Sequence, residues 1–172
     1  MKKILIIGSG GASKSTLARE LGSILGLEVI HLDAWYWNSG WVETPKAEWQ
    51  SIVQDLILRE SWIMDGNYNG TLDIRLSVAD TVIFLDFPRT LCLLRVIKRR
   101  FVYARQYRPD IASDCPERLT WKFIKYIWSY PIIRRPGILE KLSQLPPNQQ
   151  VIILREPTEV REFLQNISHH SD

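Results

Sequence analysis

The sequence has few cysteines and no long apolar run. Its two cysteines, Cys92 and Cys115, form neither a Cys-x-x-Cys pair nor a zinc-binding spacing. This cysteine content is typical of a reducing compartment, so we expect a cytoplasmic protein. No apolar stretch approaches the ~20 residues of a transmembrane helix, so we expect no membrane span. The apolar residues 4–7 are also too few for a signal peptide and favour a buried first strand.

The sequence also lacks a strong excess of charge. It has 22 basic and 19 acidic residues, which gives a formal net charge of +3. Such a mild excess does not by itself indicate a nucleic-acid-binding protein. Residues 95–108, however, contain no acidic residue and are suited to binding phosphate groups. The basic residues of this segment are Arg95, Lys98, Arg99, Arg100, Arg105 and Arg108.

Short apolar runs alternate with segments of helical periodicity, without repeats or a flexible linker. This alternation predicts a single α/β domain over residues 1–172, in which a five-stranded parallel sheet has helices on both faces. We expect strands at residues 4–7, 29–32, 62–64, 81–85 and 151–154. We expect helices at about residues 15–25, 45–57, 90–102, 116–130, 136–142 and 159–167, the first of them ending at Gly26.

One glycine or charged residue stands at or just past the end of each expected strand. In an open parallel sheet, ligands bind at the carboxyl ends of the strands. We therefore expect these residues to meet at one edge of the sheet. They are Gly8, Asp33, Asp65, Asp86 and Arg155.

A glycine-rich segment connects the first expected strand to the first expected helix. It matches the phosphate-binding pattern G-x-x-x-x-G-K-[ST] at Gly8, Lys14 and Ser15, with Ser13 in place of the second glycine. In such a loop, main-chain N–H groups and the helix N-terminus bind phosphate, the lysine bridges two phosphates, and the hydroxyl binds Mg²⁺. The pattern therefore predicts ATP and Mg²⁺ as cofactors. The alternative is a glycine-rich turn between strand and helix that binds no ligand. The loop is Gly8-Ser9-Gly10-Gly11-Ala12-Ser13-Lys14-Ser15-Thr16.

Ser13 is the one departure from the pattern. If the backbone requires a positive φ there, a residue other than glycine costs ~1–2 kcal/mol. We expect that replacing Ser13 by glycine tightens nucleotide binding or leaves it unchanged.

The motifs resemble those of the adenylate-kinase-related P-loop proteins known as DNA topology modulation proteins. Where that family has Ser-Gly before the lysine, this chain has Ala12-Ser13. The similarity extends over nearly the whole chain. It includes the glycine-rich loop, His31-Leu32-Asp33-Ala34, Trp62-Ile63-Met64-Asp65-Gly66-Asn67-Tyr68, Phe84-Leu85-Asp86-Phe87-Pro88-Arg89, Lys98-Arg99-Arg100, Arg108-Pro109-Asp110 and Cys115-Pro116-Glu117.

A broader resemblance is to adenylate kinase and shikimate kinase. It implies a three-layer P-loop NTPase fold of the nucleoside monophosphate kinase type. An acceptor arm would lie at about residues 33–60 and an arginine-rich lid at about residues 100–120. By this resemblance, Asp65 lies near Mg²⁺, and Arg95 and Arg99 are the paired arginines that open the lid. Arg75 is similar to the arginine that grips the acceptor's phosphate, Arg134 and Arg135 are similar to those that return after the lid, and Arg155 lies near the adenine loop.

Several of these residues have a second interpretation. Asp33 contacts either the acceptor or Mg²⁺ in the functional interpretation, and caps a helix or turn in the structural one. The structural alternative for Asp65 is an Asp-Gly turn, and for Asp86 it is a cap of the following helix. Arginines on a helix often form only a solvated face. The aromatic residues Trp35, Tyr36, Trp37 and Trp41 either stack on a base or pack the arm. We expect His31 to be packed rather than catalytic, and Trp121, Phe123, Ile124, Ile127 and Trp128 to form a core stripe.

The favoured function is ATP-dependent phosphoryl transfer, by direct in-line displacement, to a small acceptor. The acceptor is a nucleotide, a nucleoside or another hydroxyl metabolite. Lys14, Arg95 and Arg99 would stabilise the transferred group and Asp33 would contact the acceptor. One alternative is a nucleotide-dependent DNA-topology or regulatory binding protein without kinase activity, and another is a slow ATPase. Direct contact with nucleic acid is not indicated, because no DNA-reading helix pair is recognisable. Both a monomer and a homodimer are compatible with the sequence.

Overall fold

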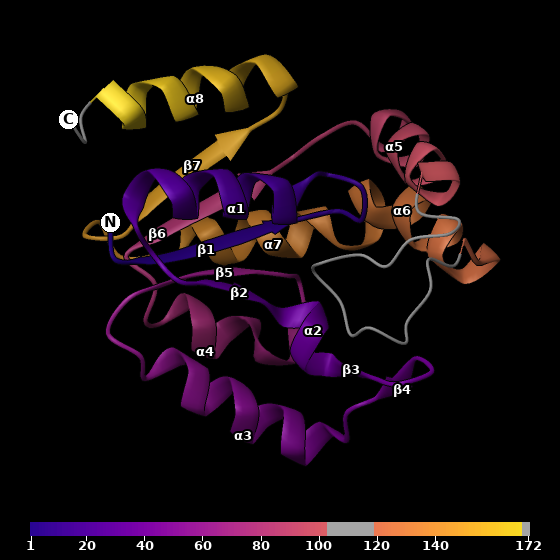
Figure 1. The fold of residues 1–172 in the computed structure, drawn as a ribbon, viewed down its shortest axis with the longest axis horizontal. Coiled ribbons are helices and arrows are strands. Elements are labelled where there is room, and N and C mark those ends of the chain that lie inside the picture. The colour runs from indigo at the N-terminus through magenta and orange to yellow at the C-terminus, as the bar shows by residue number, and fades with distance from the viewer. Residues whose placement is uncertain (103–118, 170–172) are drawn as a thin grey trace.

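The computed structural model describes residues 1–102 and 119–169 of the chain. Its main sheet has five parallel strands in the order β2-β5-β1-β6-β7 (Figure 1). The strands are β1 (Lys3–Gly8), β2 (Val29–His31), β5 (Trp62–Asp65), β6 (Thr81–Leu85) and β7 (Gln150–Leu154). The predicted five-stranded parallel sheet is confirmed, and no strand boundary differs from its expected position by more than one residue.

Helices cover both faces of the sheet, because side chains alternate along the buried strands. In β1, Leu5 and Ile7 join one apolar cluster, and Ile4 and Ile6 join the other. The first cluster is completed by α3 (Lys46–Ile57), α4 (Leu72–Leu76) and α7 (Arg135–Ser143). The second is completed by α1 (Lys14–Leu25), α5 (Arg89–Val102) and α8 (Pro157–His169). The predicted three-layer arrangement is therefore confirmed (Figure 1).

Two helix ends have clear local causes. The helix α1 ends at Gly26, where φ is 65° and the N–H group donates to the carbonyl of Gly22, so the predicted stop is confirmed. The helix α6 (Trp121–Ile133) begins after Thr120, whose side chain accepts a hydrogen bond from the N–H of Phe123 at 3.2 Å.

The segment between β2 and β5 contains elements that the sequence did not predict. Leu32, expected to end a strand, begins the short helix α2 (Leu32–Tyr36). A two-stranded hairpin follows, formed by β3 (Trp37–Asn38) and β4 (Val42–Glu43), and its turn places Gly40 and Trp41 at φ values of 75° and 67°. The 3-10 helix η1 (Asn69–Thr71) and α4 were also missed.

The apolar stripe expected on α6 is only partly correct. Phe123 and Ile127 pack into the core, whereas the side chains of Trp121 and Trp128 are 83% and 48% exposed. Arg105, Arg108 and most of the predicted lid lie outside the described residues. Within residues 1–102 and 119–169, no helix is long and apolar enough to span a membrane.

Candidate functional site

The glycine-rich loop, residues 8–16, lies between β1 and α1, as its pattern predicts, and packs tightly against its surroundings. Gly11 has a φ of 79°, and a Cβ atom there would lie 2.3 Å from the carbonyl oxygen of Cys92 in α5. A Cβ atom on Gly8 would lie 2.7 Å from the carbonyl oxygen of Leu85 in β6. Glycine at these two positions therefore allows the loop to approach the neighbouring helix and strand.

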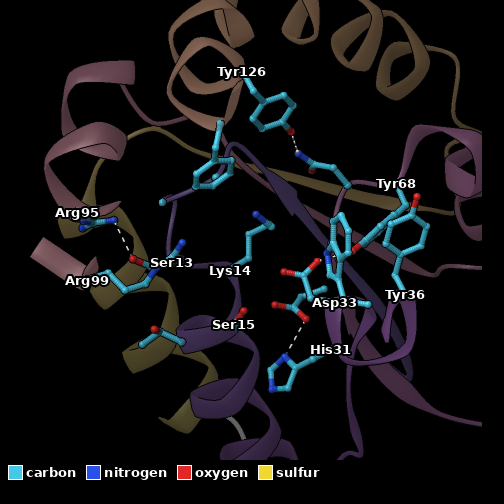
Figure 2. A pocket seen from close by; sticks show the side chains of 18 of the residues that line it. Ser13, Lys14, Ser15, His31, Asp33, Tyr36, Tyr68, Arg95, Arg99 and Tyr126 are labelled. Atoms are coloured by element: carbon cyan, nitrogen blue, oxygen red, sulfur yellow. Dashed lines mark hydrogen bonds and ion pairs between the residues drawn. The ribbon is translucent and has the colours of Figure 1, made fainter. Parts of the chain in front are cut away.

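Ser13 adopts the left-handed conformation considered above, with φ 67° and ψ 30°. Its side chain does not cap α1. Instead, its Oγ atom accepts a hydrogen bond of 3.0 Å from Nη1 of Arg95 (Figure 2). The position therefore carries backbone strain and connects the loop to α5.

Lys14 is the first residue of α1, and its ammonium group lies over the loop. The Nζ atom donates a hydrogen bond of 3.0 Å to the carbonyl oxygen of Ser9. Burial lowers the pKa of Lys14, while the carboxylates of Asp65 and Asp33 act in the opposite direction. The lysine is thus a desolvated cation beside two carboxylates, where a polyphosphate would add further negative charge.

A cavity of about 970 Å³ opens in front of the loop. This volume is at the upper end of the range typical of small-molecule sites. Gly8, Ser9 and Ala12 belong to the loop but do not line the cavity. The predicted site residues that do line it are Gly10, Gly11, Ser13, Lys14, Ser15, Thr16, Asp33, Asp65, Arg95, Arg99 and Arg134.

Asp65 ends β5 and is held by His31 at the end of the neighbouring strand. The Nδ1 atom of His31 lies 2.8 Å from Oδ1 of Asp65, whose side chain is only 4% exposed. The prediction that His31 merely packs was incomplete, because its ring also lines the cavity. The parallel register that pairs His31 with Asp65 explains this contact.

Asp33 lies in the first turn of α2 and contacts Tyr68, which follows β5. The hydroxyl of Tyr68 donates a hydrogen bond of 2.6 Å to Oδ1 of Asp33. Burial, reinforced by this carboxylate, raises the pKa of Tyr68. The backbone of Tyr68 is unusual, with φ 29° and ψ 71°, so the loop after β5 is held in a strained conformation.

Arg75 holds that strained loop in place. Its location argues against the role expected from the resemblance, which was to bind the phosphate of the acceptor. The guanidinium is fully buried and does not line the cavity. It donates to the carbonyl oxygens of Thr71 at 3.2 Å, Gly66 at 2.9 Å and Tyr68 at 3.0 Å, and also to that of Asn67. The structure therefore places Arg75 beneath the loop after β5, where its donors are used by main-chain oxygens and are not directed at an acceptor's phosphate.

Two more predicted site arginines lie away from the cavity. Arg135 pairs with Asp86 through Nε–Oδ1 and Nη2–Oδ2 contacts of 2.8 Å each, so these two residues neutralise each other. Arg155 is exposed, and its main-chain N–H group donates to Glu159. The strands are parallel, so all of the residues expected at the strand ends lie at or just past these ends, at one edge of the sheet, but of the four charged ones only Asp33 and Asp65 line the cavity.

Three basic residues of α5 line one side of the cavity. Arg95 and Arg99 are four residues apart and share a helix face with Lys98. The guanidinium of Arg95 also lies 5.1 Å from the ring centre of Phe87. Figure 2 shows Arg95 and Arg99 across the cavity from Asp33 and His31, with Lys14 between them. The sequence-predicted cations therefore lie beside the loop rather than on a purely solvated face.

An aromatic wall, formed by Tyr36, Trp37, Trp41 and Tyr68, lines the side of the cavity that includes Asp33. The rings of Tyr36 and Trp37 meet edge to face at 5.0 Å, as do those of Trp37 and Trp41 at 5.3 Å. Tyr36 and Tyr68 also contact the buried Trp49 of α3. These residues thus pack the arm, as one interpretation expects, and also face the cavity, while their stacking on a base stays a prediction. Trp35 does not line the cavity.

Sequence reasoning missed the link between the loop after β5 and α6. The Oδ1 atom of Asn67 accepts a hydrogen bond of 2.9 Å from the N–H of Gly8, and its Nδ2 atom donates one of 2.8 Å to the hydroxyl of Tyr126. Asn67 carries a usable signal, since it lies two residues after the end of a buried strand. Tyr126 carries none, because an aromatic residue in a helix most often belongs to the core.

A second, smaller groove of about 260 Å³ borders the same loop. It lies between the start of α1, the residues around α5 and the start of α8. It shares Ser13, Thr16 and Arg95 with the main cavity, and its other lining residues are Ala12, Leu17, Glu20, Leu85, Phe87, Pro157, Val160 and Arg161.

Comparisons with known proteins support the fold. The structure is similar to shikimate kinase from Acinetobacter baumannii in complex with shikimate, with a TM-score of 0.65, 18% identity, and coverage of 97% of this chain and 90% of that one. It is also similar to shikimate kinase from Bacteroides thetaiotaomicron, with a TM-score of 0.52, 18% identity, and coverage of 97% and 96%. The chain therefore has the P-loop kinase fold that the sequence predicted.

The sequence comparisons are less informative. No family model matches the chain. A Bacillus subtilis (strain 168) protein described as "Uncharacterized protein YqaC" is 32% identical over 103 residues, which are 58% of this chain. The chain spans only 57% of that relative's length. The resemblance to DNA topology modulation proteins therefore stays a prediction.

Proposed function

We propose that this protein transfers the γ-phosphoryl group of ATP, with Mg²⁺, to a small acceptor bound in the main cavity. The observation that carries the proposal is the arrangement of opposite charges around one opening. Lys14, Arg95 and Arg99 surround the phosphate side, and Asp33 lies across from them. This arrangement is what a reaction that moves a negatively charged group toward a hydroxyl requires.

The residues at the loop fit a magnesium ion bound together with ATP. Among the described residues, no three His, Cys, Asp or Glu side chains cluster as a metal site. Mg²⁺ in phosphoryl-transfer sites needs only one or two protein ligands, because phosphate oxygens and water supply the others. The Ser15 hydroxyl and the Asp65 carboxylate both line the cavity and provide the hard oxygen ligands that Mg²⁺ prefers. When bound, the ion would neutralise charge on the phosphates.

The smaller groove fits the base of the nucleotide. It borders Ser13 and Thr16, so a base placed there leaves its phosphates at the loop. Pro157 offers an apolar surface on one side, and the guanidinium groups of Arg95 and Arg161 offer planar surfaces on which a base can stack. Pro157 and Arg161 of α8 therefore take, in this proposal, the role near the adenine that the sequence resemblance gave to Arg155.

The chemistry assigned to the chain is mainly positioning and charge neutralisation. Asp33 accepts the hydrogen bond of the acceptor hydroxyl, and the donated hydrogen bond of Tyr68 fixes the orientation of its carboxylate. The acceptor oxygen then bonds to the γ-phosphorus while the bond to the leaving ADP oxygen breaks, and the hydroxyl proton passes to Asp33. Lys14, Arg95 and Arg99 neutralise the charge on the transferred group.

Calorimetry of ATP binding with Mg²⁺ tests this function together with ADP production on a panel of metabolites. We expect Lys14→Ala to weaken ATP binding about 100-fold, because a charge-assisted contact to phosphate is lost. Lys2→Ala is the matched control, since the exposed side chain of this lysine pairs with the exposed Glu60 on the surface. Unchanged ATP binding in Lys14→Ala, or a folded wild-type protein that binds neither ATP nor GTP, would contradict the proposal.

A further inference from the structure

The two sides of the main cavity carry opposite charge. Residues 31–68, all of them described, contribute three carboxylates to its lining and neither a lysine nor an arginine. The carboxylates are those of Asp33, Glu43 and Asp65. The basic lining residues come instead from the start of α1, from α5 and from α6 with its C-terminal flank. They are Lys14, Arg19, Arg95, Lys98, Arg99, Lys122 and Arg134.

An acceptor that carries a phosphate would need a cation on the carboxylate side. Arg75, the arginine that the resemblance assigned to this role, does not supply it, because its guanidinium is buried beneath the loop after β5. Four main-chain carbonyl groups, those of residues 66, 67, 68 and 71, accept its hydrogen bonds. Arg75 thus offers no guanidinium to a ligand on this side.

The aromatic wall has the features of a site for a flat or positively charged group. Trp37 lies edge to face with both Tyr36, at an interplanar angle of 87°, and Trp41, at 68°, so the rings form a corner. Glu43, which also lines the cavity, accepts a hydrogen bond of 3.0 Å from the hydroxyl of Tyr36. Ring faces attract planar groups and cations, and adjacent carboxylates strengthen the attraction for cations while repelling anions.

We propose that the acceptor is a hydroxyl compound without phosphate or carboxylate, whose flat or cationic group lies against the aromatic wall while its hydroxyl meets Asp33. This inference rests on the proposed kinase function and narrows its substrate class. It argues against nucleoside monophosphates as acceptors. Nucleosides and amino alcohols are two sources of the required chemistry. Among the described residues that follow α5, Arg134 is the one arginine in the lining, and the experiment decides whether it serves an anionic acceptor instead.

The test compares matched pairs that differ in one anionic group. The full chain is given ATP and Mg²⁺ with a nucleoside or its 5′-monophosphate, with choline or phosphocholine, and with shikimate or its methyl ester. ADP production gives kcat/KM for each compound. Binding of each compound is measured separately by calorimetry in the presence of Mg²⁺ and β,γ-imido-ATP. We expect kcat/KM and affinity to be at least tenfold higher for the member without the anionic group in the preferred pair.

Two variants separate the two sources of acceptor. Glu43→Gln keeps a hydrogen-bond acceptor for Tyr36 but removes the charge, so it should raise KM for a cationic acceptor about tenfold and leave a neutral nucleoside within about twofold. Trp37→Leu should weaken either class by removing a ring of the wall. Binding of β,γ-imido-ATP at wild-type affinity shows that each variant is folded.

Each outcome bears on the proposal. A preference for the anionic member of every productive pair, or equal use of both members, overturns it. Failure of every compound to bind while β,γ-imido-ATP binds also overturns it and leaves nucleotide binding intact. If β,γ-imido-ATP itself does not bind, the proposed kinase function fails, and this inference fails with it.

Discussion

Replacing Ser13 by glycine tests the strain in the phosphate-binding loop. Ser13 has φ 67° and ψ 30°, a conformation in which a residue with a Cβ atom is less stable than glycine by ~1–2 kcal/mol. Glycine relieves this strain but loses the hydrogen bond from Arg95, which contributes roughly 0.5 kcal/mol at an exposed site. Glycine also raises the conformational entropy of the unfolded chain, which costs about 0.4–1 kcal/mol. No capping hydrogen bond is lost, because Ser13 makes none to α1.

These terms place the stability of Ser13→Gly within about 1 kcal/mol of the wild type. Ser13→Ala is the matched control, since it loses the same hydrogen bond and keeps the strain. We therefore expect the glycine variant to be more stable than the alanine variant by about 1 kcal/mol. In a chain of this length, that difference corresponds to roughly 2–4 °C in Tm.

Thermal and urea unfolding of the three proteins measure this difference, and calorimetry with Mg²⁺ measures ATP affinity. Ser13→Gly should bind ATP as tightly as the wild type or more tightly, because glycine adopts the left-handed loop conformation without strain. An alanine variant as stable as the glycine variant would refute the strain argument. A large loss of ATP affinity in Ser13→Gly would refute the interpretation of this position as a relaxed form of the phosphate-binding pattern.

Three further predictions follow from buried charge and from the acceptor side. Arg75→Lys should lower the free energy of unfolding by about 3 kcal/mol, because an ammonium cannot reach four spread carbonyl oxygens; exposed Arg155→Ala is the control, and equal urea midpoints would contradict the role given to Arg75. Burial lowers the pKa of Lys14 in the folded protein below its ordinary value of 10.5. Between the lowered pKa and 10.5, the unfolded chain binds more protons than the folded protein, so the destabilisation caused by this buried charge falls as pH rises. Lys14→Met should accordingly be more stable than the wild type at pH 7.5, by up to about 1 kcal/mol, with a smaller advantage near pH 10 in urea unfolding; an advantage that grows with pH would show the reverse shift. Asp33→Asn should lower kcat about 100-fold with little change in ATP affinity, because it removes the proton acceptor but not a phosphate contact; an unchanged kcat would exclude Asp33 from the reaction.

The sequence was sufficient for the sheet and the phosphate-binding loop because both depend on local, periodic features. Four apolar residues before a glycine-rich loop and an amphipathic helix after it leave few alternatives to a strand–loop–helix unit. The same reasoning located Lys14, Asp33 and Asp65, since the edge where strands end follows from the order of elements along the chain. Element ends were predicted within one residue where a glycine or a charged residue follows the apolar pattern, as at Gly26 after α1 and Asp65 at the end of β5.

The remaining part of the site depends on contacts between distant residues. Arg75 occupies a short helix with no distinctive spacing, and only the folded path of residues 66–68 shows that its guanidinium binds carbonyl groups. Asp86 and Arg135 are 49 residues apart, and their pairing has no local signal. Trp121 and Trp128 fit a core stripe by periodicity, but Trp121 is largely exposed, and the ring of Trp128 is covered by the guanidinium of Arg89 rather than by apolar side chains of the core.

The contact at Gly11 has a consequence for how the cations reach the phosphates. A hydrogen atom fits between this residue and the Cys92 carbonyl, but nothing larger does, so the loop and the first turn of α5 have little freedom to slide past each other. Arg95 lies three residues farther along that helix and already touches Ser13. The position of the Arg95 guanidinium is therefore fixed by protein contacts alone, so a nucleotide bound as we propose would lose little affinity to reorganisation of the protein around it.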